Sequence, residues 1–339
     1  MKQQPINGQH HVSMITKDAK QNLWLYTEVL GLRLVKKTVN QDDPSMYHLF
    51  YGNRNGAPGT EVSFFEMPNA GQTRKGTNSI SSFSLLVPSD EALSYWASRL
   101  DSFEVPHEAI VSIGERKSLT FYDRDELMVH LVSAEKDNGI ELVEPWITED
   151  IPPQYAIVGL GPVELTVREA SRTKAVLEDI LGYTQARTVP SMGDPKVMVD
   201  IYETGKGGLY TELQVKEVND KDRERPGKGS IHHVAIRVKD VEELTEWAAK
   251  ITAAGFKNTG VIDRYYFHAL YFRDPNHILF ELATDGPGFE IDESFDALGE
   301  NLTLPSFLEE RREEIESKLH PIANTNTTMK RGHNHDGTI

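Results

Sequence analysis

An internal repeat constrains the fold of this 339-residue chain more than any other feature. When the sequence is shifted against itself by 151 residues without a gap, Leu30-Gly31 aligns with Leu181-Gly182, and Trp96-Ala97 aligns with Trp247-Ala248. Such self-similarity indicates that one structural unit is built twice. Each copy in turn contains two similar successions of strand, helix and strands, so the sequence predicts four modules.

Each module is predicted to run β-α-β-β-β. In the first, an apolar strand at residues 11–15 is followed by Asp18, which suits a helix N-cap, and by a helix that stops at Gly31. In the third, a strand at 163–167 and a helix from 168 to 181 repeat this order. Short strands separated by Gly, Asn and Asp turns follow each helix. The predicted fold class is therefore α+β, with four βαβββ modules that form two cupped, mixed β-sheet barrels.

The predicted segments are bounded by shifts in composition and periodicity. They are module 1 at 7–68, module 2 at 78–135, a connector at 136–156, module 3 at 157–215, module 4 at 230–285, a C-terminal loop and helix at 286–320, and a disordered tail at 321–339. Trp96 and Trp247, in the helices of modules 2 and 4, are predicted to pack those helices onto their sheets.

Composition narrows the class of partner. A net charge of −16 repels phosphate backbones and anionic lipids, which argues against nucleic-acid and membrane-surface binding. No apolar run approaches the ~20 residues that span a bilayer, and the N-terminus has no secretory apolar region, so we expect a cytoplasmic protein that acts on a small molecule. The absence of cysteine excludes disulfides, zinc-thiolate sites and thiol nucleophiles. The charge and composition are also compatible with a homo-oligomer.

Three residues have the pattern of metal ligands. His11 and His233 each stand second in a His-His-Val triplet at the start of an apolar strand, and Glu281 lies at the end of a matching strand. Two imidazoles and one carboxylate are the ligands of non-haem ferrous sites that keep open coordination positions. The sequence therefore predicts a metal-dependent enzyme with Fe(II), and Mn, Ni or Zn are the alternatives.

Whether these ligands meet depends on how the modules pair. The shift of 151 residues aligns His11 with Pro162, Glu61 with Glu212, Ser82 with His233, and His130 with Glu281. If modules pair along the chain, both cups hold mixed sites. If module 1 pairs with module 4, one cup collects His11, Glu61, His233 and Glu281, and modules 2 and 3 form a vestigial cup. We favour the second pairing because Pro162 can bind no metal and Ser82 binds one only poorly.

Five stretches carry a resemblance to a known family. They are His10-His11-Val12, Tyr47-His48-Leu49-Phe50-Tyr51-Gly52, Pro58-Gly59-Thr60, Ile231-His232-His233-Val234 and Phe272-Arg273-Asp274-Pro275. In this order and spacing, which extend over nearly the whole chain to Thr284, the sequence resembles the vicinal oxygen chelate superfamily of glyoxalases, bleomycin resistance proteins and extradiol dioxygenases. More narrowly, it resembles the hydroquinone-type ring-cleaving dioxygenases.

The resemblance implies iron bound by His11, His233 and Glu281, and an enzyme that cleaves a hydroquinone-type aromatic ring with O2 in quinone detoxification or aromatic catabolism. The positions that surround the metal in this family correspond to His10, His232, Arg264 and Tyr271, and Ser13 stands where some relatives have Thr.

The residues themselves support parts of this assignment. Tyr271 shares a strand face with Phe267 and precedes Glu281 by ten residues, so it can point into the same cup. We expect Arg264 to stabilise a developing anion, a neighbouring histidine to move the phenolic proton, and His48 to donate a hydrogen bond to the substrate.

Two other functions remain open at this point. Glu61 corresponds to a fourth metal ligand in glyoxalase-type members, and with four ligands a glyoxalase I-like isomerase on nickel or zinc becomes plausible. A non-catalytic, small-molecule-binding resistance protein is the third reading. The complete set of His11, His233 and Glu281 counts against it.

Overall fold

The computed structural model describes residues 6–113, 116–137, 143–191 and 196–322. The first module contains β1 (Gln9–Thr16), α1 (Ala19–Trp24), the π-helical turn η1 (Leu25–Val29), β2 (Arg33–Val39), β3 (Tyr47–Gly52) and β4 (Glu61–Glu66). The second contains β5 (Ser79–Val87), α2 (Asp90–Ser102), β6 (Val111–Ile113), β7 (Arg116–Tyr122) and β8 (Met128–Ser133).

The second half repeats this order. The third module, after the short helix η2 (Pro153–Tyr155), contains β9 (Gly159–Val167), α3 (Ala170–Ala175), η3 (Val176–Ile180), β10 (Thr184–Pro190), β11 (Met198–Glu203), η4 (Leu209–Thr211) and β12 (Leu213–Glu217). The fourth contains β13 (Ile231–Val238), α4 (Val241–Ala253), β14 (Ile262–Asp263), β15 (Phe267–Arg273) and β16 (Leu279–Pro287). The α+β fold class is therefore confirmed.

Strand pairing joins the outer modules to each other and the inner modules to each other. Strand β1 pairs antiparallel with β13, and their parallel neighbours are β4 and β16. Strand β5 pairs antiparallel with β9, and their parallel neighbours are β8 and β12. The prediction that modules 1 and 4 share a cup is confirmed, and the alternative pairing along the chain is wrong.

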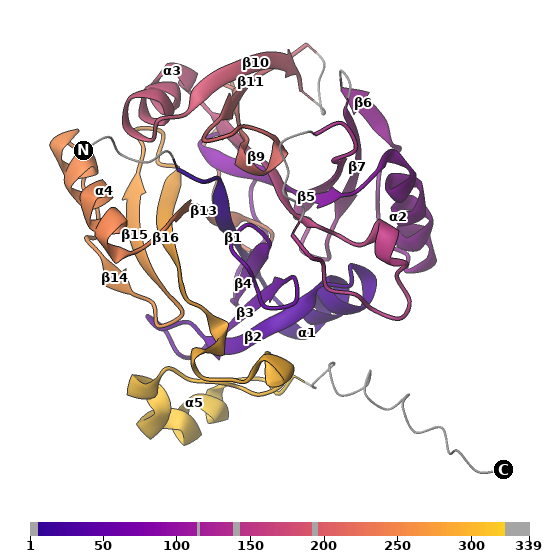
Figure 1. Ribbon diagram of the computed structural model, residues 1–339, viewed down its shortest axis with the longest axis vertical. Helices are drawn as coiled ribbons and strands as arrows, with labels where there is room; N and C mark the ends of the chain where they lie inside the picture. Colours follow the sequence, from indigo (N-terminus) through magenta and orange to yellow (C-terminus); the bar gives the residue numbers. More distant parts are fainter. Residues whose placement is uncertain (1–5, 114–115, 138–142, 192–195, 323–339) are drawn as a thin grey trace.

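The two cups are continuous with each other. One bridged pair, Ile231 with Ile80, connects β13 to β5, so the strands make a single 16-stranded mixed sheet. The sheet is open, because its path ends at β10 on one side and at β2 on the other. Figure 1 shows α1 to α4 on the outside of the curved sheet, which leaves the concave faces of both cups free of helices.

Local sequence signals account for the helices. The Asp18 side chain accepts hydrogen bonds from the backbone N–H groups of Lys20 and Gln21 and so caps α1. The helical segment ends at Gly31, whose φ of +67° suits a residue without a Cβ, as predicted. Its second half is a π-helical turn, which the sequence pattern did not indicate. Trp96 and Trp247 are buried against the sheets, as expected.

The C-terminal segment covers the outer edge of the first module. It comprises η5 (Phe289–Ile291), η6 (Phe295–Ala297), η7 (Ser306–Arg311) and α5 (Arg312–Lys318). The Thr303 N–H donates to the Lys37 carbonyl, so this segment extends the edge of the sheet at β2. Figure 1 shows α5 beyond that edge, below β2 in this view.

Two further predictions concern the ends and the connector. Residues 321 and 322 are described, and the rest of the predicted disordered tail lies outside the described residues, as do connector residues 138–142. Within the described part of the chain, no helix combines the length and apolar character that a membrane crossing requires.

Candidate metal centre

The three predicted ligands converge at the base of the cup that modules 1 and 4 form. His11 lies on β1, His233 on β13 and Glu281 on β16, and the pairing described above makes these strands neighbours. The Nε2 atoms of His11 and His233 are 3.2 Å apart. Oε2 of Glu281 lies 3.2 Å from His11 Nε2 and 2.7 Å from His233 Nε2. All three side chains are buried, and His11 and His233 also line the cavity described below.

The size of this triangle fits one divalent cation. Two atoms bound at right angles to an ion, with bonds of about 2.1 Å, are about 3.0 Å apart. The three separations of 2.7 to 3.2 Å bracket this value, so the atoms can occupy one face of an octahedron. In addition, Glu281 Oε2 is buried and accepts no hydrogen bond. Such an orphaned oxygen is costly unless a cation or donor meets it.

The hydrogen-bond network sets the tautomer of His11. His10 Nε2 faces the Thr284 carbonyl at 3.1 Å, and a carbonyl only accepts, so His10 carries its proton on Nε2. Burial and the neighbouring His11 lower the pKa of His10 to about 3, so its Nδ1 is unprotonated near neutral pH. This Nδ1 lies 3.0 Å from His11 Nδ1, which must therefore donate. The free lone pair of His11 is left on Nε2, where a metal would bind it.

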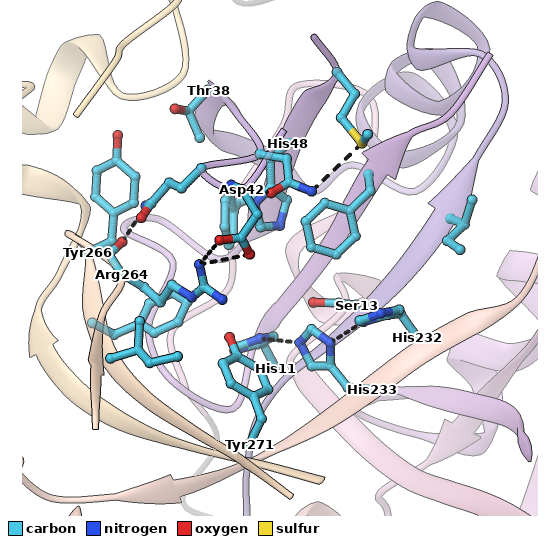
Figure 2. A pocket seen from close by; sticks show the side chains of 18 of the residues that line it. His11, Ser13, Thr38, Asp42, His48, His232, His233, Arg264, Tyr266 and Tyr271 are labelled. Atoms are coloured by element: carbon cyan, nitrogen blue, oxygen red, sulfur yellow. Dashed lines mark hydrogen bonds and ion pairs between the residues drawn. The ribbon is translucent and has the colours of Figure 1, made fainter. Parts of the chain in front are cut away.

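The duplicated His-His-Val motif repeats the arrangement on β13. His232 Nδ1 lies 2.8 Å from His233 Nδ1, and burial followed by the neighbouring His233 lowers the pKa of His232 to about 3. A neutral His232 accepts the His233 Nδ1–H, and His233 Nε2 then presents its lone pair to the same point as His11 Nε2. Each ligand histidine is thus oriented by the histidine before it in sequence. Figure 2 shows His232, His233 and His11 next to one another, joined by dashed lines.

Tyr271 orients the carboxylate. It stands opposite Glu281 in the β15–β16 register, and its hydroxyl donates to Glu281 Oε1 at 3.1 Å, which directs Oε2 toward the imidazoles. Burial raises the pKa of Glu281, but imidazolium groups at His11 and His233 outweigh burial and hold that pKa well below its usual range, and a cation bound by the neutral imidazoles would favour the ionised carboxylate in the same way. The cup therefore presents an ionised carboxylate.

Glu61 stands apart from the three ligand atoms. It is paired with His11 in the β1–β4 register, and its Oε1 lies 3.8 Å from His10 Nδ1. A ligand atom of Glu61 lies within 4.8 Å of one in His10 and one in His11, and the second group, His11, His233 and Glu281, shares only His11 with the first. Burial, and after it the charge of Glu281, raises the pKa of Glu61 well above its usual range.

We expect the variant Glu61→Gln to retain its metal, because the carboxylate lies on the His10 side of His11 rather than beside Nε2. The measurement is metal content per chain after anaerobic purification, compared with the parent protein. Metal loss in this variant would instead favour a four-ligand centre.

A cavity of about 440 Å³ lies above the ligand atoms. This volume is within the range of about 300 to 1,000 Å³ that is typical of small-molecule sites. Aromatic side chains form much of its wall, among them Phe50, Phe65, Tyr266, Phe267 and Tyr271. Such a wall suits a flat aromatic ligand that stacks on or edges against the rings.

Arg264 enters this cavity opposite His233. Its guanidinium lies over the Tyr271 ring at 5.4 Å and pairs with Asp42 at 3.1 Å. Gln41 donates to the Arg264 carbonyl at 2.7 Å, so the loop between β2 and β3 is tied to the start of β15 across the cavity (Figure 2). Sequence reasoning placed Arg264 in the site but missed Asp42 and Gln41, for which the turn-like composition of their loop gave no signal.

Ser13 and His48 lie on the opposite wall. Ser13 Oγ is 2.6 Å from Ser63 Oγ, which is 3.1 Å from His48 Nε2. His48 is sandwiched between the rings of Phe50 and Phe65, with centroids 4.0 and 4.1 Å away. Both residues line the cavity, and their polar atoms are joined through Ser63, for which the sequence gave no signal.

The cup of modules 2 and 3 has no such ligand triangle among the described residues. At the corresponding positions, His130 is hydrogen-bonded to Thr120, and Glu212 is buried and held by Arg116 and Arg187. Both side chains are thus engaged by residues of their own cup.

Comparisons with known proteins agree with the fold. The chain belongs to the Glyoxalase/Bleomycin resistance protein/Dioxygenase superfamily, whose family model matches residues 8–131 and 159–282, one match in each duplicated half.

Within this superfamily, the chain is similar to the "Putative ring-cleaving dioxygenase MhqA" of Bacillus subtilis (strain 168), with 51% identity over 317 residues that cover 94% of this chain and 99% of the relative. It is 30% identical over 320 residues to the chlorohydroquinone/hydroquinone 1,2-dioxygenase of Sphingobium indicum, covering 91% of this chain and 95% of that protein. A crystal structure titled as a putative dioxygenase from Bacillus subtilis superposes with a TM-score of 0.84 and 35% identity, covering 94% of this chain and 98% of that one.

Proposed function

We propose that this protein is a ring-cleaving, extradiol-type dioxygenase that holds Fe(II) and acts with O2 on hydroquinone-type aromatic compounds. The observation that carries this proposal is the triangle of His11 Nε2, His233 Nε2 and Glu281 Oε2 at the floor of a cavity with an aromatic wall. Three ligands on one face are the pattern of non-haem Fe(II) oxygenases. The names of the relatives MhqA and the Sphingobium hydroquinone dioxygenase point the same way.

The protein's own groups define what the cavity does to a substrate. When bound, a ferrous ion supplies the redox chemistry that lets a spin-paired aromatic ring react with O2. The aromatic wall holds the ring and excludes water, and Phe50 and Phe65 keep His48 in place beside it. Arg264 directs its positive charge into the cavity, where it stabilises a phenolate oxygen and the negative charge that develops as the ring opens.

The glyoxalase-type alternative requires Glu61 as a fourth ligand and a base. Its carboxylate is grouped with His10 and His11 but not with His233 and Glu281, which disfavours isomerase chemistry. A protein that only bound a small molecule would not require the buried Oε2 of Glu281, which has no hydrogen-bond partner. We therefore place the protein among enzymes that act on small aromatic molecules in the cytoplasm, in quinone detoxification or aromatic catabolism.

The test is oxygen uptake by anaerobically purified protein after reconstitution with Fe(II). Methylhydroquinone, chlorohydroquinone and hydroquinone form the main panel, catechol is the extradiol comparison, and the hemithioacetal of methylglyoxal and glutathione probes isomerase activity. Oxygen consumption with the hydroquinones supports the proposal. Isomerisation of the hemithioacetal on nickel or zinc, without oxygen uptake from any phenol, would overturn it.

We expect Arg264→Met to lower kcat/KM for hydroquinones about 100-fold, which is the size of effect seen when one group that stabilises a developing oxyanion is removed. Metal content should not change, because Arg264 contacts Tyr271 and Asp42 and none of the three ligands directly. Arg311→Met removes the same charge from an exposed pair with Glu314 and serves as the matched control. Full activity of Arg264→Met would remove this residue from the site.

A further inference from the structure

The cup of modules 2 and 3 contains a second cavity, of about 350 Å³, that the proposed dioxygenase reaction does not use. It is also within the range of about 300 to 1,000 Å³ that is typical of ligand sites. Under the shift of 151 residues, several residues that line it correspond to residues that line the first cavity. Three of these correspondences are Pro162 for His11, Glu164 for Ser13 and Arg116 for Phe267.

Arginines replace the metal site in this second cup. Glu212 is fully buried beneath the cavity, and its Oε1 accepts from Arg116 Nη1 at 2.5 Å and also from Arg187 Nη2. Arg187 also pairs with Glu203 at 2.6 Å. The two guanidinium groups thus converge on one point through a shared carboxylate, which fixes their positions.

Both guanidinium groups also remain open to the cavity. The Arg116 side chain is 30% exposed and the Arg187 side chain 34% exposed, although the carboxylate they share is 0% exposed. A guanidinium carries five N–H donors, and Glu212 engages Arg116 through Nη1. Donors therefore remain for a bidentate contact with an anion that enters the cavity.

The side chains that line the cavity include more cations than carboxylates. Three cations line it, Arg116, Arg187 and Lys136, against one carboxylate, Glu164. That carboxylate is already paired with Lys216 and accepts from Ser81 at 2.7 Å. Glu212 beneath the cavity and Glu203 beside Arg187 offset part of this positive charge, so recognition of an anion rests on the N–H donors of the two fixed guanidinium groups rather than on net charge.

The rest of the wall is aliphatic. Val132, Pro162, Val199, Ile201 and Leu209 line the cavity, and among the described residues no aromatic side chain does. The first cavity differs in this respect, since its wall contains several aromatic rings. A flexible or branched aliphatic chain can fill such a space, whereas a flat ring would lack stacking partners.

We infer that the second cup binds a small aliphatic carboxylate, with its head group against the paired guanidinium groups of Arg116 and Arg187 and its chain along the aliphatic wall. The duplication has thus produced two binding cups that differ in how they attract an anionic oxygen. One uses a metal between two histidines and a glutamate, and the other uses a fixed pair of arginines. This inference does not depend on the reaction proposed for the first cup.

Isothermal titration calorimetry with hexanoate tests it, and hexan-1-ol is the neutral probe of the same chain length. We expect one hexanoate site per chain and no binding of the alcohol. Arg116→Met should weaken hexanoate binding by about tenfold or more, because a charge-assisted hydrogen bond is lost, while Glu212 keeps Arg187 as its partner. Val199→Phe, which fills the cavity and keeps both arginines, should also weaken it.

Two control variants distinguish hexanoate binding in the second cup from binding at the surface or in the first cup. Lys117→Met removes a neighbouring charge on the same strand, from a surface pair with Asp90, and should bind hexanoate as the parent does. Glu281→Gln disables the first cup and should likewise leave the affinity unchanged. The inference is overturned if hexanoate does not bind, if Arg116→Met binds it as tightly as the parent, or if Glu281→Gln abolishes binding.

Discussion

Glu281→Gln is expected to purify without its metal and to lose oxygen uptake with every hydroquinone tested. Replacing Oε2 by an amide group removes the charge that balances the cation and places a neutral group 2.7 Å from His233 Nε2. Even substitutions behind the ligands of a metal cost about 10- to 100-fold in affinity or activity, so loss of a direct ligand should cost more than about 100-fold. His233→Ala should have the same effect. The readouts are metal per chain and oxygen uptake.

Glu212→Gln is the matched control for this experiment. Glu212 is as buried as Glu281 but lies in the other cup, among arginines. If burial of a carboxylate were what mattered, both variants would lose metal. We expect Glu212→Gln to keep its metal, and loss of metal there but not in Glu281→Gln would show that the wrong cup has been assigned.

Lys36→Met is expected to lower the free energy of unfolding by about 3 to 5 kcal/mol, the cost of removing one partner from a buried ion pair. The Lys36 side chain is 0% exposed and its Nζ lies 2.6 Å from Asp292 and 2.5 Å from Glu293, which are themselves largely buried. Asp292 also accepts from the hydroxyl of the cavity residue Tyr266 at 3.0 Å. Loss of the ammonium leaves two buried carboxylates facing each other.

Urea denaturation of metal-free protein measures this effect without a contribution from metal binding. The compensating variant adds Asp292→Asn and Glu293→Gln to Lys36→Met and should recover more than half of the loss, since no unpaired charge then remains. If Lys36→Met is as stable as the parent, or if the triple variant is no better than the single one, the ion pairs do not secure the C-terminal segment.

The sequence predicted the plan of the molecule because duplication and hydrophobic periodicity are local signals. The order β-α-β-β-β, the cap at Asp18 and the stop at Gly31 were all readable from residues close together in the chain. The pairing of modules 1 and 4 was inferred from chemistry instead, since Pro162 cannot replace a histidine as a ligand. The observed pairing of β1 with β13 agrees with that inference.

The network behind the ligands could not be predicted in the same way. The acceptor for His10 is a backbone carbonyl, that of Thr284, whose position depends on how β16 is placed beside β13 and β15. The partner of Arg264 is Asp42, 222 residues away on a loop without periodicity. Such contacts arise from tertiary structure, and a single sequence carries no pattern for them.

The arginine pair of the second cup could not be predicted from the sequence either. The sequence indicated that its positions are unsuited to a metal, since Pro162 and Ser82 stand where the first cup has His11 and His233. Arg187 on β10 and Glu212 at the start of β12 are joined within module 3, and the pairing of modules 2 and 3 brings Arg116 on β7 to them.

The central claim is that one cation is held by His11 Nε2, His233 Nε2 and Glu281 Oε2, with its remaining face open to the aromatic cavity. Anomalous diffraction at the iron absorption edge, from crystals of Fe(II)-loaded protein grown without oxygen, tests it most directly. We predict a single peak within bonding distance of those three atoms and of neither carboxylate oxygen of Glu61. A peak between His10 and Glu61, a peak in the second cup, or ligand side chains turned away from one another would contradict the account.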